Sequence, residues 1–302
     1  MNQRPWVKPT MGFLGLGKMG TPMAQSLLRS GTSLIVWNRS APASRQLAEQ
    51  GAQIAESVEE LFDRCDLVFT MLADHQVLDQ VLDRSGGGIE RLLPGRLLVN
   101  TATVPPDYSR ALNREVVAAG GLMVEAPVSG SRRPAEQAQL IGMLAGPPDA
   151  VAQVSAIMPA MCAQVVDCGA IPNALTMKLA VNTFLIATVT GLAETYHFAE
   201  RAGLDLNALR GVLDASQMAS PISREKVRKI AEADRSPQAS ISDVHMNTRL
   251  ILDAAAHNHA AMPLLEACED LYKYAIELGH ESLDMIDVIR ALASRGPDRL
   301  GT

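Results

Sequence analysis

The sequence has few aromatic residues, few cysteines and no excess of positive charge, and each shortage excludes a class of protein. Aromatic residues make up 4% of the 302 residues, yet 47% are hydrophobic, which is enough to bury a core and excludes a disordered chain. The 27 lysines and arginines are outnumbered by 33 aspartates and glutamates, and neither half of the chain is basic. We therefore expect no nucleic-acid partner.

The four cysteines are too few for a disulfide scaffold and lack the short spacings that hold zinc. They are Cys65, Cys162, Cys168 and Cys268. We interpret them as reduced, small core residues and predict no metal site.

The chain also lacks a recognisable targeting or membrane segment. Residues 1–10 (MNQRPWVKPT) are polar with two prolines and contain no apolar stretch of about 7 to 15 residues, so we expect a disordered tail and a cytoplasmic protein. The most apolar segment, residues 174–193, contains Lys178 and Asn182, which a bilayer-spanning helix rarely tolerates at its centre. We predict that it is the buried helix of a soluble protein.

Short apolar runs alternate with helical stretches in the first half of the chain. The runs at residues 11–16, 33–37, 67–72, 96–100 and 122–127 predict strands, and residues 18–30 and 43–50 predict helices between them. This rhythm predicts a parallel sheet covered on both faces, the doubly wound α/β fold. Residues 141–145 and 164–167 are two further candidate strands, and we place the end of this domain, residues 11–170, after them.

The second half, residues 171–302, loses the strand pattern and predicts an all-α domain. Pro172 is suited to the first turn of a long helix that reaches about Ala202 and ends at Gly203. Shorter helices are predicted at residues 207–215, 221–233, 244–257, 263–278 and 282–294.

A glycine-rich motif follows the first predicted strand and opens an amphipathic helix. Its sequence, Gly15-Leu16-Gly17-Lys18-Met19-Gly20, has the GxGxxG spacing that a dinucleotide pyrophosphate requires. The first glycine permits a tight turn, the second lets the backbone approach the phosphates, and the third lets the helix pack on the strand. We expect residues 15–19 to contact the cofactor.

The residues after the second strand indicate which dinucleotide binds. NAD-binding sites usually place a carboxylate there, on the ribose hydroxyls, but this chain has Asn38, Arg39 and Ser40. A guanidinium pairs with a 2′-phosphate, which a carboxylate would repel, so we predict NADPH in preference to NADH. The alternative is that Arg39 is a solvated loop residue that stacks on the adenine.

Five segments in order resemble the β-hydroxyacid dehydrogenase family: GFLGLGKMGTPMA, NRS, MLAD, APVSGSRRPAEQAQLIGMLAG and MKLAVN. The similarity covers about residues 11–295, and the SGSRRPAE, NRS and MKLAVN segments are most similar to the glyoxylate/succinic semialdehyde reductase branch. The resemblance implies a Rossmann-like N-terminal domain, a long interdomain helix and an all-helical C-terminal domain. It also implies a homodimer or homotetramer formed through the helical half.

Lys178 is the candidate for the acid that a carbonyl reduction needs. It lies in an apolar helical stretch, where burial would lower the pKa of its amine, and Asn182 follows four residues later on the same helix face. The alternative is a lysine whose stem runs along the helix to solvent. The resemblance matches these two residues to the family's catalytic KxxxN motif, which implies catalysis by Lys178 and substrate binding by Asn182.

Ser129 and Gly130 follow an apolar run at the sheet edge where α/β proteins bind ligands. Their amides could hold a substrate carboxylate, although Ser-Gly is most often a plain turn. The resemblance assigns both to substrate binding, together with Ser131, where the reductase branch also has serine. Arg132 and Arg133 could attract an anion or form a solvated surface pair.

The resemblance assigns three further residues. Thr103 matches the residue near the nicotinamide and substrate, and Leu72 and Ala73 match the backbone contact on the ribose side of the cofactor. Ala102 departs from the family's serine, so one hydroxyl contact is missing. Asp74 is expected to cap the helix that follows.

The C-terminal half departs most from the family pattern. Ala239 replaces an aromatic residue that covers the substrate, and Met246 and Asn247 replace a Lys-Asp pair whose lysine reaches the cofactor. We expect Met246 to contact the cofactor and the cleft to be wider or more apolar. His245 and Asp243 could have taken over a polar role, but a hydrogen-bonded loop histidine is the simpler interpretation, and His257 and His259 point to different helix faces.

The sequence thus predicts an NADPH-dependent oxidoreductase that reduces a small aldehyde or keto acid, with Lys178 as general acid. One alternative is an NAD(P)-dependent 3-hydroxy acid dehydrogenase that oxidises substrates of the 3-hydroxyisobutyrate or tartronate semialdehyde type. Less favoured alternatives are an imine reductase and a non-catalytic NADPH-binding protein.

Overall fold

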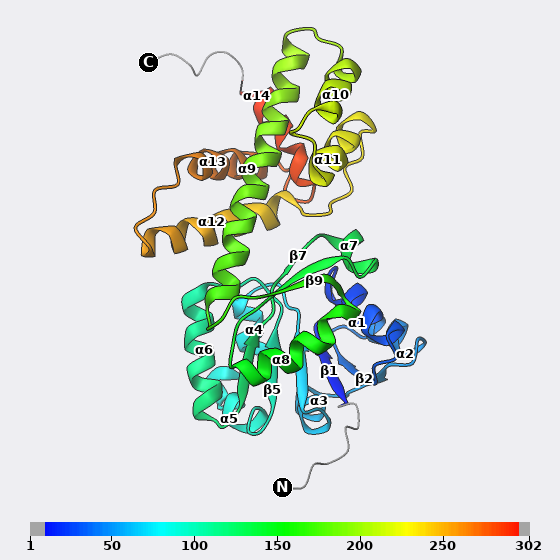
Figure 1. Cartoon of the computed structure of the whole chain (residues 1–302), viewed down its shortest axis with the longest axis vertical. Coiled ribbons are helices and arrows are strands. Elements are labelled where there is room, and N and C mark those ends of the chain that lie inside the picture. Colours follow the sequence, from blue (N-terminus) through cyan, green and yellow to red (C-terminus); the bar gives the residue numbers. More distant parts are fainter. Residues whose placement is uncertain (1–9, 296–302) are drawn as a thin grey trace. The chain divides into compact units, whose positions relative to one another are not determined.

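The computed structural model describes residues 10–295 (Figure 1). The chain divides into two compact units, Met1–Lys178 and Leu179–Thr302, called here the N-terminal unit and the helical unit. Except for Thr10, the tail expected at residues 1–10 lies outside the described residues.

The N-terminal unit is built on a six-stranded parallel sheet. Its order is β3 (Gln53–Ile54), β2 (Leu34–Trp37), β1 (Met11–Leu14), β4 (Leu67–Thr70), β5 (Leu97–Asn100) and β6 (Leu122–Glu125). This is the strand order of the Rossmann fold, so the predicted doubly wound domain is confirmed. The order reverses between β1 and β4, which is the position where such sheets bind ligands.

Helices cover both faces of this sheet (Figure 1). They are α1 (Gly20–Arg29), α2 (Ala41–Ala48), α3 (Val58–Arg64), α4 (His75–Val81), α5 (Gly88–Leu92), α6 (Pro106–Ala118) and α8 (Pro148–Ile157), with a 3₁₀ turn at Arg84–Gly86. Successive strand residues point to opposite faces, so Phe13 and Phe69 join one apolar cluster and Leu14 and Val68 join the other. The two clusters hold the layers together.

The two late strands that the sequence predicts are present, but they form a separate sheet. β8 (Leu140–Leu144) pairs with β7 (Val128–Ser129) in antiparallel fashion and with β9 (Cys162–Asp167) in parallel fashion. The short helix α7 (Arg132–Glu136) connects β7 to β8, and a 3₁₀ turn at Met158–Ala160 precedes β9.

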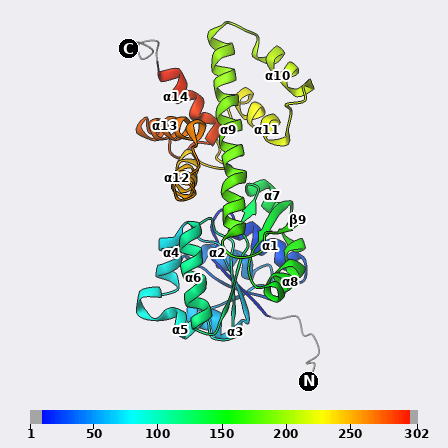
Figure 2. The same ribbon diagram turned by 60° about the vertical axis from the view of Figure 1, so that its left-hand side comes forward.

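The helical unit contains the helices that periodicity predicts, with one exception. They are α9 (Asn173–Arg201, which begins in the N-terminal unit), α10 (Leu206–Ala215), α11 (Pro221–Ala231), α12 (Ile241–His257) and α13 (Pro263–Glu277) (Figure 2). The helix predicted at residues 282–294 is wrong in part, because it divides into a 3₁₀ turn at Met285–Val288 and α14 (Ile289–Ser294). Asp284 caps this turn by accepting the Ile286 N–H.

A buried ion pair joins two elements of the helical unit. The Lys226 amine on α11 lies 2.6 Å from the Asp284 carboxylate, and the two side chains are 1% and 0% exposed. The other Asp284 carboxylate oxygen accepts the Gln238 N–H at 2.9 Å. Because both charges are removed from water, loss of one partner would leave the other buried without an opposite charge.

The prediction that α9 is a buried helix is wrong for most of its surface. Only 33% of its most apolar 18-residue window is buried. Phe184 and Phe198 are 76% and 70% exposed, and Met177 and Val181 are also exposed on α9. By length and composition alone α9 could cross a membrane, which is weak evidence because core helices of soluble proteins meet the same criterion.

All four cysteines are free thiols, as predicted. Cys65, Cys162 and Cys268 are buried, and burial raises the pKa of the Cys65 thiol to about 11 and that of Cys162 to about 12. Cys168 is only half-buried.

Candidate active site

The glycine motif forms a tight loop between β1 and α1. Gly15 has a φ of +97°, and a Cβ there would lie 2.3 Å from the Met71 carbonyl oxygen. A Cβ at Gly20 would lie 1.9 Å from the Gly15 carbonyl oxygen. The first and third glycines are therefore required by the packing of the protein itself.

The second glycine is not required by that packing. Gly17 is exposed, and a Cβ there would meet no protein atom within 4 Å. Within residues 10–295, the backbone N–H groups of residues 17–20 donate to no acceptor, and the first turn of α1 has no acidic residue and no side-chain cap. Free amides at a helix N-terminus bind anions, so this loop fits the pyrophosphate of a dinucleotide.

Asn38, at the end of β2, holds the glycine loop in place. Its Oδ1 accepts the Leu16 N–H at 2.9 Å, and its Nδ2 donates to the Ser40 carbonyl oxygen and hydroxyl at 3.0 Å. The amide is therefore already engaged with the protein, and its observed role is to shape the loop. The Arg39 side chain is exposed and forms no ion pair within the described residues, so its guanidinium can pair with a phosphate.

The segment after β4 lies beside the glycine loop. The Leu72 side chain would meet a Cβ at Gly15 at 2.8 Å, and Ala73 is exposed. Asp74 caps α4, since its Oδ1 accepts the Val77 N–H at 2.8 Å, as predicted.

Thr103 follows β5 and is half-buried. Thr101, just after β5, is held against the end of β4, because its hydroxyl donates to the Thr70 carbonyl at 2.8 Å. Ala102 is 1% exposed and packs in an apolar cluster with Val104 and Leu175. Ala102 therefore serves as a small packing residue of this cluster.

Ser129 and Gly130 lie where β7 ends. Ser129 is half-buried, and Gly130 has a φ of +129°, where a Cβ would lie 2.7 Å from Leu140 Cδ2. Glycine is thus required at this turn, which fixes the backbone amides after β7. Ser131 precedes α7 and its carbonyl accepts the Ala135 N–H at 3.1 Å.

The two arginines that follow are surface residues. Both are exposed, and the Arg132 guanidinium pairs with Glu136 at 2.8 Å on the same short helix. This geometry favours the solvated surface pair over an anion-attracting role.

Lys178 lies on α9 with only 9% of its surface exposed, so its stem does not carry the amine into solvent. Burial lowers the pKa of the amine from 10.5 to about 8. Within residues 10–295 no carboxylate lies within ion-pairing distance of it. A lysine with this pKa exists in both protonation states near neutral pH and can both give and accept a proton.

Residues of the helical unit that depart from the family pattern form local hydrogen bonds. Asn247 Oδ1 accepts the Asn182 amide at 3.0 Å, and Asn247 Nδ2 donates to the Asp243 carbonyl at 2.8 Å. Asn247 thus supplies an acceptor oxygen to Asn182. Met246 is 36% exposed, and Ala239 packs against the core of the unit.

His245 is hydrogen-bonded, as predicted, but it is not a loop residue. Its Nε2 lies 2.9 Å from Glu269 Oε1, and it belongs to α12, whose N-terminus is a capping box of Ser240 and Asp243. Among the residues that the structure describes, no group of three or more His, Cys, Asp or Glu side chains could hold a metal ion.

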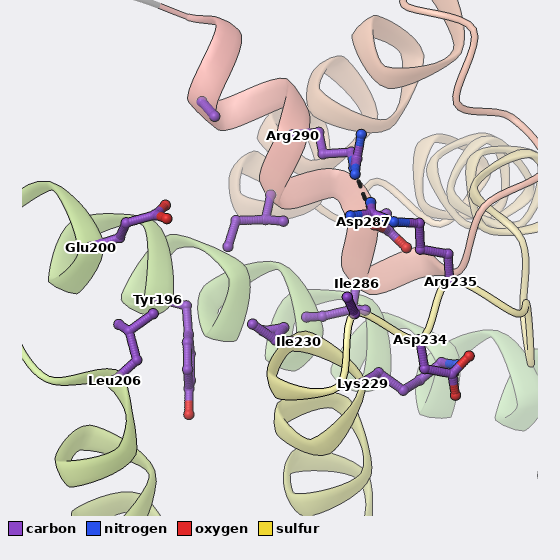
Figure 3. A pocket seen from close by; sticks show the side chains of 13 residues that line it. Tyr196, Glu200, Leu206, Lys229, Ile230, Asp234, Arg235, Ile286, Asp287 and Arg290 are labelled. Atoms are coloured by element: carbon purple, nitrogen blue, oxygen red, sulfur yellow. Dashed lines mark hydrogen bonds and ion pairs between the residues drawn. The ribbon is translucent and has the colours of Figure 1, made fainter.

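The helical unit also contains a cavity of about 240 Å³ (Figure 3). Residues of α9 and α11 and of the segments around Asp234 and Asp287 line it. Four of its charged residues form ion pairs, Lys229 with Asp234 at 3.0 Å and Arg235 with Asp287 at 2.8 Å. None of the predicted catalytic, substrate or cofactor residues lines it. We therefore place the candidate site at the carboxyl edge of the parallel sheet instead.

Models of known protein families match both halves of the chain. A model of the NAD binding domain of 6-phosphogluconate dehydrogenase matches residues 10–169, and a model of the NAD-binding region of NADP-dependent 3-hydroxyisobutyrate dehydrogenase matches residues 173–292. Glyoxylate/succinic semialdehyde reductase 1 of Arabidopsis thaliana is 31% identical over 282 residues, which are 93% of this chain and 98% of that protein.

The chain belongs to the β-hydroxyacid dehydrogenase family. Chloroplastic glyoxylate/succinic semialdehyde reductase 2 of the same plant is 32% identical and is matched over 94% of this chain and 79% of its own length. The structure of 3-hydroxyisobutyrate dehydrogenase from Mycobacterium tuberculosis with L-serine has a TM-score of 0.84 and 26% identity, covering 95% of this chain and 99% of that one. As a β-hydroxyacid dehydrogenase, the protein is an NAD(P)-dependent oxidoreductase that acts on CH–OH and C=O groups.

One buried residue of this region was missed by the sequence analysis. Glu125, the last residue of β6, is 0% exposed and hydrogen-bonds to the first turn of α9. A single acidic residue at the end of an apolar run was the available signal, but only the structure shows its partners.

Proposed function

We propose that this β-hydroxyacid dehydrogenase uses NADPH to reduce a small aldehyde or keto acid to the hydroxy acid, with Lys178 as general acid. The observation that carries the proposal is a buried lysine with a lowered pKa on a helix whose first turn is hydrogen-bonded to the last residue of β6. The glycine loop lies at the same edge of the sheet, so the proposed proton donor and the dinucleotide-binding loop both belong to the N-terminal unit.

The cofactor, when bound, supplies a hydride from its nicotinamide ring. The free amides of residues 17–20 would hold the pyrophosphate, and the exposed Arg39 would pair with the 2′-phosphate, with Asn38 and Ser40 shaping the loop beside it. Leu72, Ala73, Thr103 and Met246 would complete the contacts along the nucleotide.

Lys178 would hold and move the proton. With a pKa near 8, the Lys178 amine is protonated in most molecules at neutral pH and can donate a proton to the oxygen of a carbonyl substrate. The remaining neutral fraction can remove the proton of a hydroxyl, so the same residue serves both directions.

The substrate would be held by short polar groups. We assign its carboxylate to the amides and hydroxyls of Ser129, Gly130 and Ser131, and its reacting end to Thr103 and Asn182. The names of the two plant relatives, glyoxylate/succinic semialdehyde reductases, support a short acid that carries an aldehyde.

We also propose a cytoplasmic homodimer or homotetramer. Residues 11–170 would bind the cofactor, and residues 171–302 would bind substrate and join subunits. The exposed apolar residues of α9, among them Phe184 and Phe198, support this assignment because surfaces of this kind are usually covered by a partner.

The test is a substrate and cofactor panel. NADPH oxidation would be measured with glyoxylate, succinic semialdehyde, larger aldehydes and keto acids, and cyclic imines, for the wild-type protein and Lys178→Ala. We expect turnover of small acids with NADPH ahead of NADH, and its loss in the variant. Turnover of imines alone, or tight NADPH binding without turnover of any carbonyl, would refute the proposal.

A second candidate is an NAD(P)-dependent 3-hydroxy acid dehydrogenase that works oxidatively. The likeness to 3-hydroxyisobutyrate dehydrogenase favours it, as does a pKa of Lys178 low enough for it to act as a base. Faster oxidation of 3-hydroxyisobutyrate than reduction of any aldehyde in the same panel would select this candidate.

A further inference from the structure

Glu125 joins three elements at the carboxyl end of β6. Its Oε1 accepts the hydroxyl of Ser109 on α6, and its Oε2 accepts the Leu175 N–H in the first turn of α9 at 3.2 Å. These partners lie 16 and 50 residues away in the sequence, so the carboxylate fixes the place where a distant helix begins.

Burying this carboxylate is costly. Burial raises its pKa to about 7, although the hydrogen bonds from Ser109 and from the α9 backbone and the charge of Arg110 on α6 oppose the rise. An apolar residue would fill the same position at less cost. A buried acid in this position therefore suggests a role beyond packing.

The groups facing Glu125 from its neighbouring elements are few. Arg110 contributes a positive charge from α6, and the Cys168 thiol after β9 has its pKa raised in part by Glu125. On β5, Asn100 is the strand partner of Glu125, and its Nδ2 is buried with no hydrogen-bond partner among the described residues. The ionisation of Glu125 is therefore governed mainly by its burial and by its contacts with α6 and α9.

Lys178 lies one helical turn after the residue that Glu125 binds. Lys178 comes three positions after Leu175, a rise of about 4.5 Å along the helix axis. The first turn of α9 has no acidic residue of its own, so Glu125 supplies from another element the negative charge that a helix N-terminus favours. The hydrogen bond therefore acts on the turn immediately before the one that carries the Lys178 side chain.

We propose that Glu125 is a positioning residue: its carboxylate holds the first turn of α9 against the end of β6 and thereby sets the place of the Lys178 amine. The inference rests on the proposed role of Lys178. Protonation of Glu125 removes the negative charge from the helix N-terminus and weakens this anchor, so catalysis is fastest when Glu125 is ionised and Lys178 is still protonated.

The main test compares Glu125→Gln with Ser109→Ala. Glutamine keeps the shape but removes the charge at the start of α9, whereas Ser109→Ala removes the other hydrogen bond and leaves the α9 contact intact. We expect kcat to fall about 10- to 100-fold in Glu125→Gln, the cost of a small misplacement, with NADPH affinity unchanged. Ser109→Ala keeps most of kcat at a pH high enough to ionise Glu125.

The pH profile separates positioning from mere stability. We expect the wild-type reduction rate to rise with pH through about 7 as Glu125 ionises, and this limb to disappear in Glu125→Gln. In Ser109→Ala the limb moves to higher pH, because the hydroxyl that lowered the pKa of Glu125 is gone. If Glu125→Gln fails to fold, Glu125→Asp, which keeps the charge but shortens its reach, must show the kcat loss with the limb retained.

A second readout does not depend on the proposed reaction. The rate at which an amine-reactive reagent labels Lys178, followed by peptide mass spectrometry across pH, reports on that amine even if no carbonyl substrate is found. Altered labelling in Glu125→Gln but not in Ser109→Ala supports positioning. Identical labelling and identical kcat profiles in wild type and Glu125→Gln would overturn the inference.

Discussion

Replacing Lys178 with methionine should stabilise the protein while abolishing its activity. Lowering the pKa of a buried amine from 10.5 to about 8 corresponds to about 3 kcal/mol of unfavourable free energy in the charged form. Methionine fills a similar volume without the charge, so the variant should recover up to this amount at neutral pH.

The gain should depend on pH in a defined direction. Below pH 8 the lysine is charged in both the folded and the unfolded protein, and the folded state carries the full cost. As pH rises from about 8 to 10.5 the folded lysine loses its proton first, so the advantage of Lys178→Met should shrink and then vanish.

The assay is urea unfolding of the wild type and Lys178→Met at pH 7 and near pH 10.5. Lys273→Met, at an exposed lysine of α13, is the matched control and should change the free energy of unfolding by less than about 0.5 kcal/mol. A Lys178→Met protein no more stable than wild type at pH 7 would refute the reasoning that burial lowers the pKa of this amine.

Three further predictions concern the cofactor loop and the core of the helical unit. Gly17→Ala should fold with an unfolding free energy within about 1 kcal/mol of wild type but bind NADPH weakly by fluorescence titration, whereas Gly15→Ala should also destabilise the fold because of its positive φ. Arg39→Asp should shift the ratio of NADPH to NADH affinity at least about tenfold toward NADH, and an unchanged ratio would refute the 2′-phosphate contact. Lys226→Met should cost about 3 to 5 kcal/mol in denaturant unfolding, since it leaves Asp284 buried without its partner, and a loss below 1 kcal/mol would contradict that estimate.

Local sequence patterns were sufficient to predict the parallel sheet and the cofactor loop. Each central strand is a short run buried on both faces, and the spacing of Gly15, Gly17 and Gly20 specifies a turn that few other sequences can form. These features depend on neighbouring residues, so a single sequence records them.

Features that depend on distant partners were not predictable. The runs at 141–145 and 164–167 show strand propensity, but not that they pair with each other or that β8 also pairs with β7 in a second sheet. The apolar composition of α9 suggested burial, whereas the exposure of Phe184 and Phe198 depends on which helices pack beside it. The bond between Asn182 and Asn247 likewise joins residues 65 positions apart.

The roles of the site residues rest on geometry to different degrees. The structure places the free amides of the glycine loop and the buried amine of Lys178 in one unit, which supports hydride and proton delivery at one sheet edge. The contacts of Ser129, Thr103 and Asn182 with substrate are predictions of the proposed function.

A single-turnover measurement on Lys178→Ala tests the central claim most directly. Protein loaded with NADPH would be mixed with glyoxylate or succinic semialdehyde, and NADPH absorbance would be followed through one turnover, after fluorescence titration shows equal NADPH binding by both proteins. If Lys178 supplies the proton, the variant should oxidise its bound NADPH about 10² to 10⁴ times more slowly than the wild type. Oxidation at the wild-type rate in Lys178→Ala would contradict the account.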